Sequence, residues 1–295
     1  MEKYGLIAAI LSPFFSSVST IFKSEAAKDL SPLIVVSFGG IIGSIILFII
    51  AGFRKEKISK KLIKNNLKDL SFLIVLRFIV GELVLTYGLV NTTAIKAIFF
   101  TKIEPFFVLI LAWFVMKEKI KIRQLVLLII HLFGAILLST GGLFLGLHMG
   151  DLLVIVAMFC FAATYISGKK ISHNLGSTLG SAIPMGVASL ILLPFAIFSS
   201  YSDIFSYSSK GWEYLFIYVI LFNVIALTLW YFSLKEVKGW IVSALRYLGP
   251  IFGAPVAYFL FGQTLGSIQI VGACIIIATS LFIVRENLSS YRKDK

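Results

Sequence analysis

The chain has 295 residues, of which 59% are hydrophobic and only 14% are charged, and its mean hydropathy is +0.98. Soluble domains carry about 25% charged residues, so this composition excludes a water-soluble fold and indicates an integral membrane protein. The formal net charge of +13 could favour nucleic-acid binding, but the positions of the basic residues give it another explanation.

Ten apolar runs follow one another along the chain, and each is long enough to cross a membrane. A spanning helix needs about 20 apolar residues for a hydrocarbon core of about 30 Å. The first run lacks a clear small-residue cleavage site, so we expect a span there rather than a signal peptide. We predict an all-α integral membrane protein with ten transmembrane helices, at residues 4–22, 32–53, 70–90, 96–116, 122–143, 151–171, 178–199, 212–234, 240–261 and 266–284.

The basic residues predict the orientation, because lysine and arginine concentrate in cytoplasmic loops. With the N-terminus inside, 20 of the 27 basic residues lie on the cytoplasmic side and three lie within spans. Both termini are therefore predicted to be cytoplasmic, in a cell membrane. Contact with anionic lipid headgroups then explains the basic charge, and we expect no nucleic-acid partner. The four basic residues placed outside are Lys23, Lys28, Lys96 and Lys210.

The two halves of the chain resemble each other at an offset of about 145 residues. The segment "IEPFFVLILAWFVMKEKIKIRQ" aligns with "LGPIFGAPVAYFLFGQTLGSIQ", which sets Pro105 opposite Pro250. Each half holds five spans, and because five is odd the second half must be inverted relative to the first. Inverted repeats are typical of secondary transporters. We predict repeats at 1–145 and 146–286, followed by a cytoplasmic tail at 287–295.

The segment "AIKAIFFTKIEPFFVLILAWFVMKEKI" resembles the fourth span of the EamA-type transporters, within the drug/metabolite transporter superfamily. The matching residues are Glu104, Pro105, Ala112, Trp113 and Glu118. The second half departs from the family pattern, with Gly249 and Gln263 where the family has glutamates. The resemblance implies a central cavity lined mainly by spans one, three, four, six, eight and nine, with spans five and ten peripheral.

Five charged residues lie inside the predicted spans, where charges usually face the bundle interior or a cavity. On regular helices Glu82 and Lys102 lie about 18 and 21 Å from the cytoplasmic edge, which predicts an ion pair, either structural or part of a proton or substrate relay. Arg77 and Arg246 lie about 10 and 9 Å from that edge, without a carboxylate at their depth. They could bind a substrate carboxylate or phosphate, or extend to the headgroups. Glu104 precedes Pro105 and could also contact substrate.

Further side chains are candidates for shaping the pocket or the helices around it. Pro105 and Pro250 each free a backbone carbonyl about one turn back, so they are expected to be hinges or plain bends. His131 is expected to make a structural hydrogen bond on a peripheral span. Aromatic and amide side chains on the lining spans could complete the pocket: Tyr165, Asn223, Trp230, Tyr231 and Tyr247.

No sequence motif predicts catalysis or a cofactor. Cys160 and Cys274 lie in separate apolar runs, and we expect no metal site. A phosphate-binding loop is missing from the sequence, so ATP is not the expected energy source.

We predict a secondary transporter for a small polar or amphipathic metabolite, such as an amino acid, driven by a proton gradient, by exchange or by the solute's own gradient. The alternatives are an intramembrane enzyme acting on a lipid-soluble substrate and a passive facilitator or channel. The oligomeric state stays open.

Overall fold

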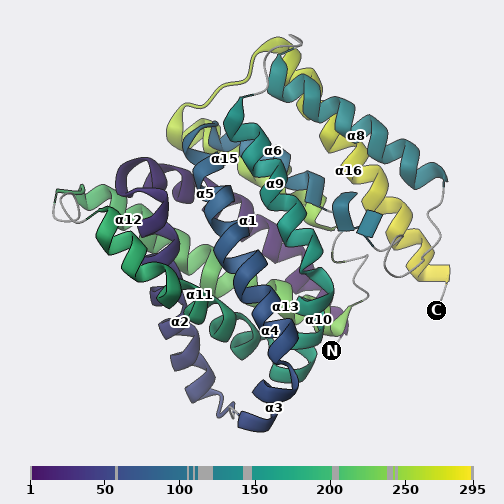
Figure 1. Ribbon diagram of the computed structural model, residues 1–295. Helices are drawn as coiled ribbons and strands as arrows, with labels where there is room; N and C mark the ends of the chain where they lie inside the picture. The colour runs from purple at the N-terminus through teal and green to yellow at the C-terminus, as the bar shows by residue number, and fades with distance from the viewer. Residues whose placement is uncertain are drawn as a thin grey trace.

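The structure is a computed structural model that describes residues 2–56, 59–104, 106–108, 110–111, 122–141, 148–200, 206–237, 242 and 245–293, and all regular secondary structure in these ranges is helical. The first half contains α1 (Glu2–Leu30), α2 (Pro32–Phe53), α3 (Lys60–Asn65), α4 (Leu67–Phe72), η1 (Leu73–Gly81), α5 (Glu82–Val90), α6 (Ala94–Phe100), η2 (Thr101–Ile103) and α8 (Ile122–Thr140). The second half contains α9 (Met149–Ala163), α10 (Tyr165–Leu175), α11 (Ser177–Ser199), α12 (Ser209–Tyr218), η3 (Val219–Ala226), α13 (Leu227–Glu236), η4 (Arg246–Leu248), α15 (Gly249–Phe261) and α16 (Ser267–Lys293). Figure 1 shows these helices packed into one bundle.

The described helices confirm a multi-pass helical membrane architecture. In the part of the chain that the structure describes, five continuous segments are long and apolar enough to cross a membrane: Lys3–Leu30, Pro32–Phe53, Leu67–Val90, Ser177–Ser199 and Ser209–Glu236. A sixth candidate consists of α9 and α10, which are bent by 48° at their junction. Shorter apolar helices cover Ile129–Leu138, Gly249–Phe261 and Ser267–Thr279. The number of ten spans and their orientation stay predictions.

Departures from regular α-helix occur at equivalent places in the two halves. Residues Leu73–Gly81 and Val219–Ala226 form π-helix, and Thr101–Ile103 and Arg246–Leu248 form 3-10 turns. Each pair is separated by the offset of about 145 residues found in the sequence. Such irregular turns are frequent at functional sites, so their recurrence directs attention to the third and fourth helices of each half.

Small residues let α2 and α11 pack closely. A Cβ added at Gly40 would lie 3.0 Å from Ser189 Cβ, and one at Gly186 would lie 3.1 Å from Ser44 Cβ. Ser44 Oγ donates a hydrogen bond of 3.1 Å to the carbonyl of Ala182 on the facing helix. Glycine and serine are the residues that let helix backbones approach each other within a membrane.

The last helix of each half, α8 and α16, lie side by side at one edge of the bundle (Figure 1). A Cβ added at Gly272 would lie 2.6 Å from the carbonyl oxygen of Gly134, so the two backbones touch there. His131 Nδ1 and Thr279 Oγ1 lie 3.0 Å apart and form a hydrogen bond across this contact. This arrangement agrees with the expected structural hydrogen bond of His131 and with the peripheral place expected for spans five and ten.

Candidate functional site

A buried ion pair connects the regions of the two 3-10 turns, η2 and η4. Arg246 Nη1 donates a hydrogen bond of 2.7 Å to Glu104 Oε1, and the guanidinium carbon lies 4.5 Å from the centre of the Trp230 ring. The expectation that Arg246 has no carboxylate at its depth was therefore wrong. That estimate compared the positions of the two backbones along the membrane normal. It left out the length of the arginine side chain, which can carry its charged group well away from its own backbone position.

Arg77 lies beside this pair, on the π-helix η1. Its side chain is buried, with the residue 5% exposed, and its guanidinium carbon is 4.7 Å from the centre of the Phe161 ring. This burial disagrees with the alternative that Arg77 extends to the headgroups. Arg77 Nε is also buried, and no residue in the described ranges accepts a hydrogen bond from it. A buried donor without an acceptor is costly.

Residues from both halves enclose a small pocket at this place. The first half contributes Arg77 and Glu104, and the second half contributes its lining from α9, α10 and α13. The volume that the centre of a water molecule can occupy in this pocket is about 10 Å³. This is space for about one water molecule. The lining from the second half is Phe161, Thr164, Tyr165, Gly168, Trp230, Tyr231 and Leu234.

The predicted site is thus only partly reproduced by the pocket. Arg77, Glu104, Tyr165 and Trp230 line it, as the sequence led us to expect, and Arg246 is bonded to one of them. The sequence reasoning missed Phe161, Thr164, Gly168 and Leu234. One usable signal was the pattern in which a threonine and a glycine interrupt an apolar run, since α9 and α10 meet at Thr164.

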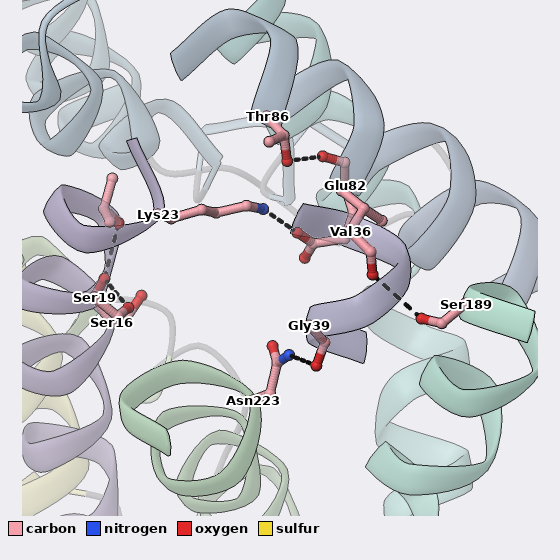
Figure 2. A network of polar contacts seen from close by, with 10 residues as sticks. Ser16, Ser19, Lys23, Val36, Gly39, Glu82, Thr86, Ser189 and Asn223 are labelled. Atoms are coloured by element: carbon pink, nitrogen blue, oxygen red, sulfur yellow. Dashed lines mark hydrogen bonds and ion pairs between the residues drawn. The ribbon is translucent and has the colours of Figure 1, made fainter. Parts of the chain in front are cut away.

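Glu82 has a different partner from the one expected. Its Oε2 lies 2.5 Å from Lys23 Nζ on α1, so the predicted pair of Glu82 with Lys102 was wrong (Figure 2). Lys23 was placed in an outside loop, but α1 continues to Leu30 and carries Lys23 into the bundle, where the residue is only 2% exposed. A lysine with a buried carboxylate partner does not need to mark the edge of the membrane.

Lys102 has different neighbours from Glu82. Lys102 is 3% exposed, and its Nζ would be 2.6 Å from a Cβ added at Gly249, beside Ser17 of α1. It is close enough to Arg246 and Glu104 for their charges to affect it. The cations Lys102 and Arg246 therefore both lie near Glu104, next to the pocket rather than within its lining.

The remaining predicted residues have separate roles in the fold. Asn223 Nδ2 donates a hydrogen bond of 2.9 Å to the carbonyl of Gly39, which ties η3 to α2 (Figure 2). Pro250 stands in the first turn of α15, where a missing N–H costs little. The expectation of a hinge or a plain bend at Pro250 stays a prediction. The backbone of Tyr247 belongs to η4, but its side chain and the whole of Pro105 lie outside the described residues.

A second hollow has a different character. It is open, measures about 770 Å³ and is lined by Leu193, Pro194, Ile197 and Phe198 of α11. Phe198 is 89% exposed on the outer surface of the bundle. An apolar outer surface of this kind is where lipid chains lie in a membrane protein, so we do not consider this hollow a site for a polar solute. Within the described residues, no group of three or more potential metal ligands is found.

The fold and the buried pocket define a class of protein: a multi-pass membrane transporter of the plasma membrane. The chain belongs to the EamA-like transporter family, which matches residues 3–140 and 148–285 as two copies. This agrees with the resemblance found in the sequence and with membership of the drug/metabolite transporter superfamily. Family and relatives are transporters, a class that is generally not enzymatic.

Three relatives illustrate the range of the family. An uncharacterised transporter of Methanothermobacter thermautotrophicus is 22% identical over 96% of this chain and 87% of its own. A probable amino-acid metabolite efflux pump of Escherichia coli is 29% identical over 61% and 63%, and the riboflavin transporter ImpX of Fusobacterium nucleatum is 24% identical over 82% and 85%. A protein of known crystal structure matches with a TM-score of 0.70 and 13% identity over 96% of this chain and 98% of that one, a likeness that concerns the fold alone.

Proposed function

We propose that this protein is a secondary active transporter that moves a small polar or amphipathic metabolite, of amino-acid type, across the membrane by alternating access. In this proposal ten transmembrane helices form two inverted repeats, at 1–145 and 146–286, with both termini and the tail at 287–295 in the cytoplasm. The observation that carries the proposal is the pocket of Arg77 and Glu104, because it is buried, charged and lined by both halves. A site between two inverted halves is the place where rocking can expose a solute to either side.

The small size of the pocket supports a gated route rather than an open pore. Its space fits about one water, so a metabolite can enter only when the walls move apart. We propose that the junction of α9 and α10, which is bent by 48°, is the hinge, since both helices carry lining residues. In our proposal α10 moves away from α13 to admit the solute. Transport would then be driven by a proton gradient, by exchange or by the gradient of the solute.

The relatives support the choice of solute. One is named a probable amino-acid metabolite efflux pump and another a riboflavin transporter. Both names describe small molecules that combine polar groups with an apolar or aromatic part. The pocket offers the same combination, with Arg77 and Glu104 beside the rings of Phe161, Tyr165 and Trp230.

Counterflow in liposomes tests the proposal. The purified full-length chain is reconstituted into liposomes loaded with an unlabelled solute, and entry of the labelled solute is followed, with amino acids and riboflavin as the first set. We expect transient, saturable accumulation above protein-free liposomes. Product formation without flux would favour an intramembrane enzyme, and flux that does not saturate would favour a channel. Either result would refute the proposal.

A further inference from the structure

Two hydrogen bonds connect α10 to the start of α4, close to the pocket but outside its lining. Ser167 Oγ donates a hydrogen bond of 2.6 Å to Asp69 Oδ1, and Asn174 Nδ2 donates one of 2.6 Å to Asn66 Oδ1. Ser167 directly precedes Gly168, which lines the pocket. The two bonds link the halves of the chain, because α4 belongs to the first half and α10 to the second. We call these two bonds the α4–α10 latch.

An equivalent contact connects α1 to the start of α12. Asp29 accepts a hydrogen bond from Ser208 Oγ, and a Cβ added at Gly211 would lie 2.9 Å from Asp29 Cγ. Asp29 and Asn174 are each the second-to-last residue of their helix, and they are separated by the repeat offset of about 145 residues. Ser208 is the N-cap residue of α12, as Asn66 is of α4. We call this contact the α1–α12 latch.

The backbone supports the equivalence of the two latches and places them at opposite ends of α2. The turn after α1 passes through Ser31 with a φ of 80°, and the turn after α10 passes through Gly176 with a φ of 83°. Residues other than glycine rarely adopt this conformation, so its presence at Ser31 indicates that the surroundings impose it. From Ser31, α2 extends for 22 residues, or about 33 Å. Beyond its end, Arg54 Nη1 donates a hydrogen bond of 3.3 Å to Thr178 Oγ1, beside the turn after α10 (Figure 1).

We propose that the two latches are the gates of the transport path, the α4–α10 latch toward one side of the membrane and the α1–α12 latch toward the other. This inference rests on the proposed transport function and identifies the residues that must separate for the solute to pass. α10 carries Tyr165 and Gly168 of the pocket wall as well as Ser167 and Asn174 of the latch. When α10 moves to admit the solute, it leaves α4 and the α4–α10 latch opens. Both latches are formed in this structure, in agreement with a pocket that holds about one water.

Both latches contain groups that water can reach when they separate. Asn174 and Ser208 are exposed, and because water then replaces the lost partner, the net cost of opening one such hydrogen bond is small. The contact of α2 with α11 has the opposite character. Its bond from Ser44 Oγ to the carbonyl of Ala182 is buried among closely packed small residues. Separation there would leave polar groups without partners in the membrane, so the latches are the places where the bundle opens.

Reversible cross-linking tests whether the latches have to open during transport. In a chain whose two cysteines are replaced by alanine, Asn66→Cys is combined with Asn174→Cys, and in a second variant Asp29→Cys is combined with Ser208→Cys. A short bifunctional methanethiosulfonate joins each pair in liposomes, and counterflow is measured before and after. We expect each cross-link to reduce counterflow to the level of protein-free liposomes, and reduction of the cross-link to restore it. Unchanged counterflow after complete cross-linking of either pair overturns the proposal.

A cross-link within one helix is the matched control. Lys60→Cys with Lys64→Cys places two exposed thiols one turn apart on α3, on the segment that directly precedes the α4–α10 latch. The same reagent should leave counterflow by this variant unchanged, because it joins no two helices. Since reduction restores the starting protein, each sample also controls for its own folding.

The reaction rate of a thiol in the pocket tests the α4–α10 latch without any solute. Leu234→Cys, on the pocket wall of α13, is placed in the cysteine-free chain in nanodiscs and treated with a water-soluble maleimide. Asn174→Ala should raise the rate about fivefold, as for one neutral hydrogen bond, and Asp69→Ala about tenfold, because Ser167 loses a charged acceptor. Asn65→Ala, an exposed asparagine beside the latch, should leave the rate unchanged. An unchanged rate in Asn174→Ala or in Asp69→Ala overturns the gate at this end.

Failure of this inference differs from failure of the proposed function. Counterflow that continues through a cross-linked latch refutes the gates and keeps the transporter. Absence of saturable counterflow by the native chain for every solute tested refutes the transporter, and the maleimide rates then still decide whether the α4–α10 latch controls access to the pocket.

Discussion

Among the described residues, two buried ion pairs connect helices, and one of the two borders the pocket. Lys23 and Glu82 are 3% and 7% exposed at their side chains, and Lys23 Nζ also lies 5.2 Å from the centre of the Tyr218 ring. Arg246 and Glu104 form the other pair, beside the additional cation of Arg77. Each pair has a glutamate oxygen without a partner in the described residues, Oε1 of Glu82 and Oε2 of Glu104.

The comparison shows what distinguishes a site from a structural contact. The Lys23–Glu82 pair is balanced in charge, and Glu82 does not line the pocket. The Arg246–Glu104 pair has an uncompensated guanidinium next to it and an adjoining space. We therefore interpret the Lys23–Glu82 pair as a structural clamp between α1 and α5, and the Arg246–Glu104 pair as part of the substrate site. The following predictions test this division.

The largest expected effect on stability is the loss of one partner of the Lys23–Glu82 pair. Lys23→Met leaves an unpaired buried carboxylate, and Glu82→Leu leaves an unpaired buried ammonium. Each should lower the free energy of unfolding by about 3–5 kcal/mol, measured by thermal unfolding in detergent. Replacing both residues removes both charges, so the double variant should recover most of the lost stability. A double variant that is as unstable as the single variants would contradict a pairwise clamp.

Removal of Arg246 should affect transport more than stability. Arg246→Met leaves Glu104 without its partner, but the side chain of Arg246 is 15% exposed, so water can reach part of this pair. We expect a smaller loss of stability than in Lys23→Met and a loss of at least about tenfold in counterflow rate, as for one charged hydrogen bond. Lys210→Met, an exposed change on α12, serves as the control. An Arg246→Met variant that transports at the native rate would show that the pair is only structural.

Adding one methyl group should affect substrate binding in the pocket wall and stability outside it. A Cβ at Gly168 would lie 3.1 Å from Tyr231 Cε1 in the pocket wall, whereas one at Gly43 would lie 2.7 Å from Asn223 Cβ outside it. Overpacking costs about 1–3 kcal/mol, and we expect Gly43→Ala to show this loss in unfolding with unchanged substrate affinity. Gly168→Ala should weaken substrate binding, measured by calorimetry. Gly52→Ala meets no atom within 4 Å and is the neutral control for crowding. Equal losses of substrate affinity in Gly43→Ala and Gly168→Ala would contradict the distinction between the pocket wall and the rest of the bundle.

The smallest effect is expected at the contact of α8 and α16, at one edge of the bundle. His131→Leu removes the hydrogen bond of 3.0 Å to Thr279 and should lower stability by about 1 kcal/mol, with counterflow unchanged. Thermal unfolding and counterflow on the same preparation measure both quantities. A strong loss of transport at native stability would instead indicate a role for His131 in coupling.

Much of the fold follows from composition, but the contacts among buried charges do not. Arg77, Glu82, Lys102 and Glu104 could be predicted to be buried, because charges within apolar runs face the interior. The partners of these charges could not be predicted, because counting residues along a helix gives the depth of a residue and not the direction in which its side chain points. The π-helices and 3-10 turns change both depth and direction, and no sequence pattern marked them beyond the repeat itself.

Residue type also limited what could be predicted about the pocket. Lys23 was assigned to a loop because an unpaired lysine usually marks a membrane edge, and the carboxylate that makes its burial favourable lies 59 residues further along the chain. Phe161 and Leu234 belong to residue types found in every span, so nothing local distinguishes pocket walls from lipid-facing surface. Such residues become identifiable only when the helices are placed in space.

Counterflow by matched variants tests the central claim most directly. The solute that binds most tightly is followed in liposomes containing the native chain, Arg77→Met, or the double variant Lys23→Met with Glu82→Leu. We predict saturable counterflow by the native chain and by the double variant, and loss of at least about tenfold in Arg77→Met. Loss of counterflow in a stably folded double variant, with native counterflow in Arg77→Met, would show that the two regions have been assigned the wrong way round.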